Sequence, residues 1–301
     1  MVKSIRFGDH WIFKWEDIEL GPPKEGEVLV KFETHDISFH AVDSNSCIQG
    51  IGAVGVVKAL GSGVTGIKPG DRVAYYDPYP TGLYVEEQIL SADKVALVPR
   101  LVLTDTAMSL LLKGMMTQFL LCSCFQVKPE HMVLIHPVAA GVGSIMCQWA
   151  KAIGATVIGT VLTKEQAAQA KEYGCHHTIL YKEEDLVSRV DKITSGQGVE
   201  VVYDFVGQET FQRSLDCLKT RGYMVSVGPS LPDPLPVSVL AAKSLFFTRP
   251  SLIHYASTPK ELKECIGEVL SNVELSVLRD LEPKTSPPLS AVQHSCGLSS
   301  N

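Results

Sequence analysis

The chain changes its pattern of apolar and polar residues close to residue 99. Before that point, short runs rich in β-branched and aromatic residues alternate with turns such as GPPKEGE and GIKPGD. The runs lie at 28–33, 52–60, 71–76 and 84–90. Many short strands separated by Gly and Pro predict a barrel-like β domain, to which we assign residues 1–103.

From residue 132 onward, apolar runs alternate with amphipathic segments. The predicted strands are 132–138, 155–161, 177–181, 199–207 and 223–228, and the predicted helices are 143–154, 164–174, 183–195 and 209–222. These strands are apolar throughout, as expected when helices cover both faces of a sheet. The pattern predicts an α/β fold with a doubly wound parallel sheet, and we assign it residues 104–250.

Two further segments frame this second region. The apolar stretch 104–125 has helical character and no flanking basic clusters. We therefore expect a buried helix that connects the domains rather than a membrane span. Residues 251–301 form a return segment with one amphipathic helix at 258–270. After about residue 278 the segment becomes Pro- and Ser-rich, and we expect it to be poorly ordered.

Composition narrows the function classes. The 301 residues are 45% apolar and 20% charged, which is typical of soluble globular proteins. A net charge of -6 argues against nucleic acid or an anionic membrane as the main partner. The first residues lack a signal-peptide core, and the eight cysteines are scattered without the spacing of a zinc knuckle. We expect a cytosolic protein with reduced cysteines and no metal.

The turn after the first strand of the second region reads AAGVG. Such a strand-to-helix turn directs backbone N–H groups and the helix dipole toward a pyrophosphate. We expect Ala140, Gly141, Val142 and Gly143 to form that site, with Ala140 tolerated if its φ is negative. The alternative is a doubly wound domain that binds nothing at this edge. A glycine motif alone is weak, but its place in a βαβ unit favours a dinucleotide.

The residues after the second strand indicate which dinucleotide would bind. NAD sites usually place an acidic residue there for the ribose hydroxyls, whereas this chain reads GTVLTKEQ. A 2′-phosphate would instead meet Thr163, Lys164 and Tyr181. We therefore expect NADP(H). The alternative for Lys164 is a solvated lysine at the start of a helix.

Several long stretches resemble one family. They include KWEDIELGPPKEGEV, AVGVVKALGSGVTGIKPGDRVAY, YVEEQILSADKVALVP, CQWAKAIGATVIGTVLTKEQAAQAKEYGCHHTILYKEEDLVSRV, VVYDFVG and LAAKSLFFTRPSL. In these stretches the chain resembles the zinc-independent, NADPH-dependent quinone oxidoreductases of the medium-chain dehydrogenase/reductase superfamily, especially the plant members related to zeta-crystallin. The resemblance extends to about residue 278.

The resemblance implies a GroES-like β-barrel domain, a Rossmann domain and a cofactor between them. It implies hydride transfer from NADPH to a quinone or another electron-poor carbonyl or enone, without catalytic zinc. Family members commonly pair through the Rossmann sheet edge, here near 244–252, so we expect a homodimer. We also expect cofactor contacts at Val206, Gly207 and Gly228, which end the last two predicted strands.

Several positions depart from the family pattern. The family turn carries a glycine where Ala140 stands, and its 2′-phosphate lysine aligns with Gln166. In the connecting helix, the threonine expected near the nicotinamide amide aligns with Met116. Thr117 is the next residue and points about 100° away on a helix. Thr117 is therefore the remaining candidate for that contact.

The substrate side departs further. Ser38 stands where the family has Asn, Ala41 replaces Asp, and a cleft loop near 40–52 is shortened. Ser38 is our candidate catalytic residue. The end of the chain after about residue 278 is atypical as well. An alternative transcript, a mis-joined gene model and a decayed gene copy would each produce such changes.

Two functions follow from these residues. The first is an active NADPH-dependent quinone or enone reductase. The second is a non-catalytic NADP(H)-binding remnant, for which Ser38, Ala41 and Met116 argue. A zinc alcohol dehydrogenase is a weaker third reading, because the Cys–His/Glu–Cys ligand set and the four-cysteine lobe are missing from the sequence.

Overall fold

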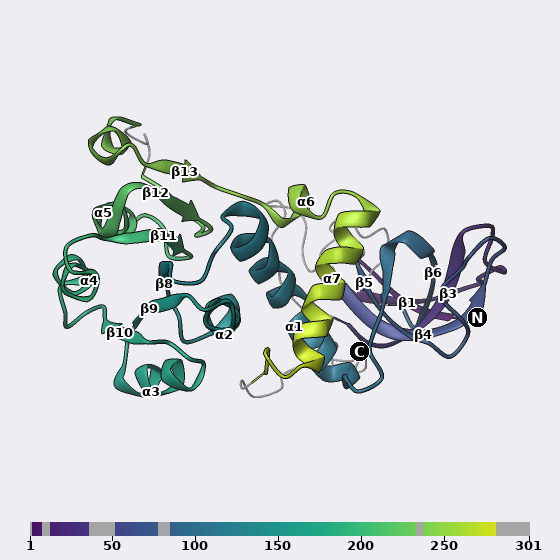
Figure 1. Ribbon diagram of the computed structural model, residues 1–301. Coiled ribbons are helices and arrows are strands. Elements are labelled where there is room, and N and C mark those ends of the chain that lie inside the picture. Colours follow the sequence, from purple (N-terminus) through teal and green to yellow (C-terminus); the bar gives the residue numbers. More distant parts are fainter. Residues whose placement is uncertain (1, 8–12, 36–51, 78–84, 233–236, 281–301) are drawn as a thin grey trace. The chain divides into compact units, whose positions relative to one another are not determined.

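The computed structural model describes residues 2–7, 13–35, 52–77, 85–232 and 237–280, with side chains from residue 19 onward (Figure 1). The chain forms two compact units. One combines residues 1–112 with 256–301, and the other is 113–255. The chain passes between them inside one helix, α1 (Thr104–Gln118). The domain limits given by the sequence, at 103 and 250, stay predictions.

The first unit, here called the antiparallel unit, contains a five-stranded antiparallel sheet. Its strand order is β6-β3-β4-β5-β7, and a separate antiparallel pair joins β1 to β2. The bounds are β1 (Val2–Phe7), β2 (Phe13–Ile18), β3 (Glu27–His35), β4 (Gly52–Leu60), β5 (Arg72–Tyr76), β6 (Glu87–Ser91) and β7 (Val95–Leu97). The predicted strand 52–60 coincides with β4, and the other three overlap β3, β5 and β6.

The core of the antiparallel unit is formed by the inward-facing residues of these strands. Alternate residues of β3 are buried, as expected for a strand with one face toward a core. The buried cluster comprises Val28, Val30, Ala53, Val57, Val73, Tyr75, Leu90 and Val95. The helix α7 (Pro259–Glu274) belongs to the same unit and contacts η1 (Ala92–Lys94) through Lys263 and Asp93, 3.2 Å apart.

The second unit, here called the parallel unit, contains a six-stranded sheet in the order β10-β9-β8-β11-β12-β13. Every pair of neighbours is parallel. The bounds are β8 (Met132–His136), β9 (Thr156–Val161), β10 (His177–Leu180), β11 (Val199–Asp204), β12 (Leu218–Ser226) and β13 (Phe246–Thr248). The strand order reverses between β8 and β11, which is the switch point of a doubly wound fold. The predicted fold class is confirmed.

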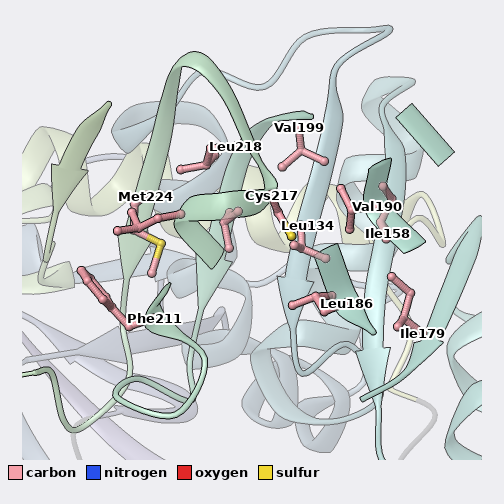
Figure 2. Packing of buried hydrophobic residues seen from close by; sticks show 12 residues of the cluster. Leu134, Ile158, Ile179, Leu186, Val190, Val199, Phe211, Cys217, Leu218 and Met224 are labelled. Carbon is pink, nitrogen blue, oxygen red and sulfur yellow. The ribbon is translucent and has the colours of Figure 1, made fainter. Parts of the chain in front are cut away.

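Helices cover both faces of the parallel sheet. They are α2 (Gly141–Ile153), α3 (Lys164–Glu172), α4 (Leu186–Thr194) and α5 (Phe211–Cys217), with the short η3 (Val237–Lys243) before β13. The four-residue α6 (Leu252–Tyr255) follows β13 and contacts η2 (Phe119–Cys124). In Figure 1, α4 and α5 lie on one face and α2 lies on the other. Figure 2 shows the apolar cluster under α4 and α5, where Leu134, Ile158 and Ile179 of the strands meet Leu186 and Phe211. This packing holds α4 and α5 against the parallel sheet.

Two element boundaries differ from the sequence prediction. The predicted helix 209–222 is wrong at its end, because α5 stops at Cys217 and β12 begins at Leu218. Leu218 is buried and pairs with Val199, and Lys219 forms an ion pair with Glu200 at 2.5 Å. Pairing with the neighbouring strand therefore overrides local helix propensity.

The connecting helix also changes form before its predicted end at residue 125. It continues after α1 as a π-helical turn, η2 (Phe119–Cys124), in which the Phe125 N–H donates to the Leu120 carbonyl. By length and composition alone, the segment Thr104–Cys124 could cross a membrane, but 56% of its apolar window is buried within the protein. Leu110, Leu111 and Met115 are fully buried. The expectation of a buried core helix is confirmed.

Candidate cofactor site

The turn between β8 and α2 is built from backbone. Ala140 has φ −149° and ψ 161°, which is an extended conformation, so the condition placed on this alanine is met. Gly141 has φ 58°, in the left-handed region that favours glycine. Ala140 is the N-cap residue and offers no side-chain acceptor to the N–H groups of α2. The end of the helix can therefore serve an anion.

Gly143 allows the helix to lie against the strand that precedes it. A Cβ on this residue would lie 2.0 Å from the Pro137 carbonyl oxygen, so only glycine fits. Next to it, the Ser144 hydroxyl donates to the Gly141 carbonyl at 2.8 Å and is buried. Val142 is half-buried between these residues. The four predicted turn residues thus form one tight strand-to-helix connection.

The end of β9 carries the residues predicted for the 2′-phosphate. Thr163 is the N-cap of α3, and its hydroxyl accepts from the Gln166 N–H at 3.2 Å. The Gln166 side chain in turn accepts from the Leu162 N–H at 2.8 Å. Lys164 is the first residue of α3 and is exposed. Gln166 therefore closes the helix end, while the Lys164 charge lies in solvent beside it.

Tyr181 lies at the end of β10 and meets an arginine that the sequence did not single out. The Arg213 guanidinium carbon lies 4.2 Å from the centre of the Tyr181 ring, and an Arg213 N–H donates to the Tyr181 hydroxyl. That hydroxyl donates to the Glu209 carbonyl at 3.4 Å. Burial raises the pKa of Tyr181, and Arg213 opposes this shift. Tyr181 therefore stays a neutral phenol at physiological pH.

A row of buried polar residues crosses the carboxyl ends of four adjacent strands. Thr160, His136, Asp204 and Ser226 come from β9, β8, β11 and β12, and the sheet register places His136, Asp204 and Ser226 directly beside one another. Residues paired in register point to the same face of a sheet. This row therefore lies on the face that α5 covers.

Asp204 anchors this row. Its carboxylate accepts from the Val206 and Gly207 N–H groups, each at 2.9 Å, and from the hydroxyls of Thr210 and Ser214. It is completely buried. Both N–H groups after β11 are already bonded, and the Gly207 carbonyl accepts from the Thr210 and Phe211 N–H groups. We therefore expect Val206 to meet a cofactor through its carbonyl and Gly207 through its van der Waals surface. One carboxylate thus shapes the predicted contact after β11.

His136 lies beside Asp204 at the end of β8. Its Nδ1 and the Thr160 hydroxyl are 2.9 Å apart. Burial lowers the pKa of His136 to about 4, although Asp204 acts in the opposite direction. Within the described residues, the buried His136 Nε2 and the Ser226 hydroxyl have no hydrogen-bond partner. The His136 imidazole is therefore neutral at physiological pH.

The remaining predicted contacts have different surroundings. A Cβ on Gly228 would lie 2.8 Å from the Gly207 nitrogen, so the turns after β11 and β12 pack directly together. Thr117 is fully buried, and its hydroxyl has no partner in the part of the chain that the structure describes. Met116 is half-buried. Ser38 and Ala41 lie outside the described residues.

Across residues 2–7, 13–35, 52–77, 85–232 and 237–280, no group of three or more His, Cys, Asp or Glu side chains is arranged to hold a metal ion. The described donors therefore do not fit a zinc site. The prediction of a metal-free protein stays a prediction of the sequence.

Sequence reasoning missed Asp204 and Arg213. Asp204 could have been found, because it directly follows the apolar run 201–203 and a glycine comes three residues later. Arg213 gave no such signal, because it meets Tyr181 through a contact between α5 and the end of β10, which are far apart in the sequence.

The chain is similar to known dehydrogenases and reductases. The zinc-binding dehydrogenase family matches residues 141–271. A 2-haloacrylate reductase from Burkholderia sp is 40% identical over 91% of this chain and 88% of its own. Quinone oxidoreductase 1 of Escherichia coli K12 is 40% identical over 92% of this chain and 89% of its own.

A solved structure gives the same relationship. The crystal structure of Escherichia coli quinone oxidoreductase complexed with NADPH superposes with a TM-score of 0.79 and 37% identity. The match covers 93% of this chain and 90% of that one. The chain therefore belongs to the quinone oxidoreductases of the zinc-binding dehydrogenase family.

Proposed function

We propose that this protein transfers hydride from NADPH to a quinone or a similar electron-poor carbonyl or enone. The observation that carries the proposal is the turn at Ala140–Gly141–Val142–Gly143, whose left-handed Gly141 and closely packed Gly143 direct the start of α2 toward the carboxyl end of β8, where a pyrophosphate would bind. The relatives support it by their names, a quinone oxidoreductase and a 2-haloacrylate reductase, and one was solved with NADPH.

Each predicted site residue has a part in this proposal. The N–H groups at the start of α2 bind the pyrophosphate. Thr163, Lys164 and Tyr181 face the 2′-phosphate. The turns at Val206–Gly207 and Gly228 lie on the other side of β8 in the strand order and bound the nicotinamide side. The unpartnered Thr117 hydroxyl suits the nicotinamide amide, because a buried hydroxyl gains by finding a partner.

This reaction requires little acid–base catalysis by the protein. Bound NADPH supplies the hydride, and a quinone accepts it readily because the product is aromatic. The side chains bind, orient and exclude water, which brings the reacting atoms together and disfavours side reactions. Ser38 is proposed to line the substrate side.

The second candidate is a non-catalytic NADP(H)-binding protein. Met116, in place of the expected threonine, favours it, together with Ser38 and Ala41 on the substrate side. This candidate keeps the cofactor site and loses turnover. It differs from the first in one measurable quantity, the rate of NADPH oxidation.

Turnover tests the proposal. The purified chain is mixed with NADPH and 9,10-phenanthrenequinone, and the loss of absorbance at the nicotinamide band is followed beside a reaction with NADH. NADPH-selective oxidation supports the reductase. NADPH binding without oxidation, in a chain that melts cooperatively, would replace the reductase with the non-catalytic protein.

Three finer assignments accompany the proposal. A homodimer suits β13, because it is an edge strand of the parallel sheet and Phe246 is 50% exposed. Sedimentation of wild type beside Phe246→Lys tests this, and a monomeric wild type would end it. The cytosolic location and the kinship with the plant members rest on the sequence and stay predictions.

A further inference from the structure

Arg213 and Tyr181 form a close pair beside the proposed 2′-phosphate site. The guanidinium lies over the ring at 4.2 Å and also donates to the hydroxyl. The two residues come from α5 and the end of β10, 32 positions apart in the chain. A cation over a tyrosine ring contributes about 0.5–1 kcal/mol at an exposed site, and more when it is desolvated. The pair therefore restricts where the Tyr181 hydroxyl lies.

The arginine is itself held in place by its helix. The Thr210 and Ser214 hydroxyls donate to the Asp204 carboxylate at 2.7 and 2.9 Å. Both residues are buried, and they flank Arg213 on α5. Phe211, also on α5, packs into the apolar cluster shown in Figure 2. The helix is thus fixed on the sheet, and Arg213 is set beside Tyr181 before any ligand binds.

The Tyr181 hydroxyl and the Arg213 guanidinium can both form further hydrogen bonds with an anion. Among the residues that the structure describes, the Tyr181 hydroxyl donates to the Glu209 carbonyl, at a long 3.4 Å. A phosphate oxygen would accept that proton in a shorter, charge-assisted bond, which is roughly twice as strong as a neutral one. A guanidinium has five N–H donors, and the bond to Tyr181 uses one of them.

The other candidates for this charge are less well placed. Gln166, at the position of the family lysine, is neutral, and its side chain already accepts from the Leu162 N–H. Lys164 is exposed at the start of α3, where water screens its charge. Arg213 is half-buried and stacked on an aromatic ring, so its charge is screened less.

We propose that Arg213 is a positioning residue for cofactor selection: it orients the Tyr181 hydroxyl and supplies the positive charge that favours a nucleotide with a 2′-phosphate. This inference rests on the proposed NADP(H) site. It predicts that the loss of Arg213 weakens binding of phosphorylated nucleotides and spares the others.

The experiment measures binding rather than turnover. NADPH and NADH are titrated calorimetrically into wild type, Arg213→Gln, Arg213→Lys and Tyr181→Phe, and 2′,5′-ADP and 5′-AMP are titrated as fragments with and without the 2′-phosphate. Arg213→Gln should lose about tenfold in affinity for NADPH and 2′,5′-ADP, which corresponds to about 1.4 kcal/mol. Affinity for NADH and 5′-AMP should change less than about twofold on the same scale.

Matched variants separate this role from a structural one. Arg213→Lys keeps the charge without the stacked fork and should recover about a third of the wild-type affinity. The double variant Arg213→Gln/Tyr181→Phe should bind no worse than the weaker single variant, because both changes remove one unit. Arg189→Gln removes an arginine that pairs with Glu184 in the same unit and should leave all four affinities unchanged.

The outcomes are distinct. Equal losses for phosphorylated and unphosphorylated ligands, or no loss at all, would overturn the role of Arg213 while leaving the proposed function intact. A wild-type chain that binds neither NADPH nor NADH would overturn the proposed function and this inference together. If Arg213→Gln does not melt cooperatively, Arg213→Lys and Tyr181→Phe carry the same comparison.

Discussion

The two units of this chain bury polar side chains in different ways. In the parallel unit, His136, Thr160, Asp204 and Ser226 are at most 4% exposed and lie in one row across four strands. In the antiparallel unit, the buried polar side chains among the described residues are Thr34 and Asp77, one within β3 and one after β5.

Topology explains the contrast. Parallel strands all end at the same edge of a sheet, so residues at their carboxyl ends gather there, whereas the ends of antiparallel strands alternate between two edges. Polar residues at strand ends can therefore build a shared site in the parallel unit. Substitutions made in matched pairs, one in each unit, test this contrast.

The largest difference is expected for the two buried aspartates. Asp204→Ala leaves two N–H groups and two hydroxyls without their acceptor, and should lower the free energy of unfolding by about 4 kcal/mol. Asp77→Ala removes the ion pair with Lys94, whose side chain is 48% exposed, and should lower it by about 1 kcal/mol. Urea denaturation with hydrogen exchange resolved by unit measures both, and equal losses would contradict the contrast.

The next pair replaces two tightly packed glycines. Gly143→Ala places a Cβ 2.0 Å from the Pro137 carbonyl oxygen, and Gly55→Ala places one 2.4 Å from that of Lys31. Each should destabilise its own unit by about 3 kcal/mol through a forced backbone shift. Only Gly143→Ala should also weaken NADPH binding, by more than about tenfold, because it displaces the pyrophosphate turn. Calorimetric titration below the melting temperature checks this, and an equal loss in Gly55→Ala would count against it.

Two histidines give a pH-dependent pair. Burial lowers the pKa of His136 and of His35 from 6.5 to about 4. The unfolded chain therefore binds more protons than the folded one between these values, and stability falls as the pH drops from 6.5 toward 4. For His136, flanked by Asp204 and Arg213, the loss at pH 5 should be about 2 kcal/mol.

The effect at His35 should be smaller, because its side chain is partly exposed and its Nε2 lies 3.1 Å from the Val85 carbonyl. Urea denaturation at pH 7 and pH 5 compares His136→Gln and His35→Gln with wild type. His136→Gln should remove most of the pH dependence. An unchanged dependence in that variant would mean that His136 does not titrate as described.

The smallest effects belong to two helix caps. Thr163 accepts from Gln166 at the start of α3, and Thr258 accepts from Glu261 at the start of α7, each at 3.2 Å. Alanine at either position should cost about 1 kcal/mol in stability. Thr163→Ala alone should also weaken NADPH binding, by about threefold, since it removes one hydroxyl from the 2′-phosphate site. A matching loss in Thr258→Ala would show that the effect is not local.

More of the fold than of the candidate site could be predicted from the sequence. Strands that are apolar throughout identified the parallel sheet, because both of its faces are covered. The end of α5 could not be predicted, because Leu218 and Lys219 become part of a strand only through their contacts with Val199 and Glu200. The π-helical turn after Gln118 also depends on tertiary packing, since the Tyr203 hydroxyl donates to the Leu120 carbonyl within it.

The residues of the candidate site also differ in whether the sequence predicts them. The turn from Ala140 to Gly143 has a signature because its backbone geometry needs glycine at fixed positions. Arg213 has none, since it meets Tyr181 only after α5 has packed on β11 and β12 in the folded chain. Local backbone geometry can be predicted from the sequence, whereas contacts between elements far apart in the chain cannot.

The most direct test of the account is thermal denaturation of the purified chain with saturating NADPH and, separately, with NADH. NADPH should raise the melting temperature more than NADH does, because the nucleotide that binds more tightly stabilises the folded form more. At 100 times its dissociation constant, a ligand adds about 2.7 kcal/mol to the stability of the folded form. A cooperative melt that neither nucleotide shifts would contradict the central claim that the strand ends of the parallel unit hold NADP(H).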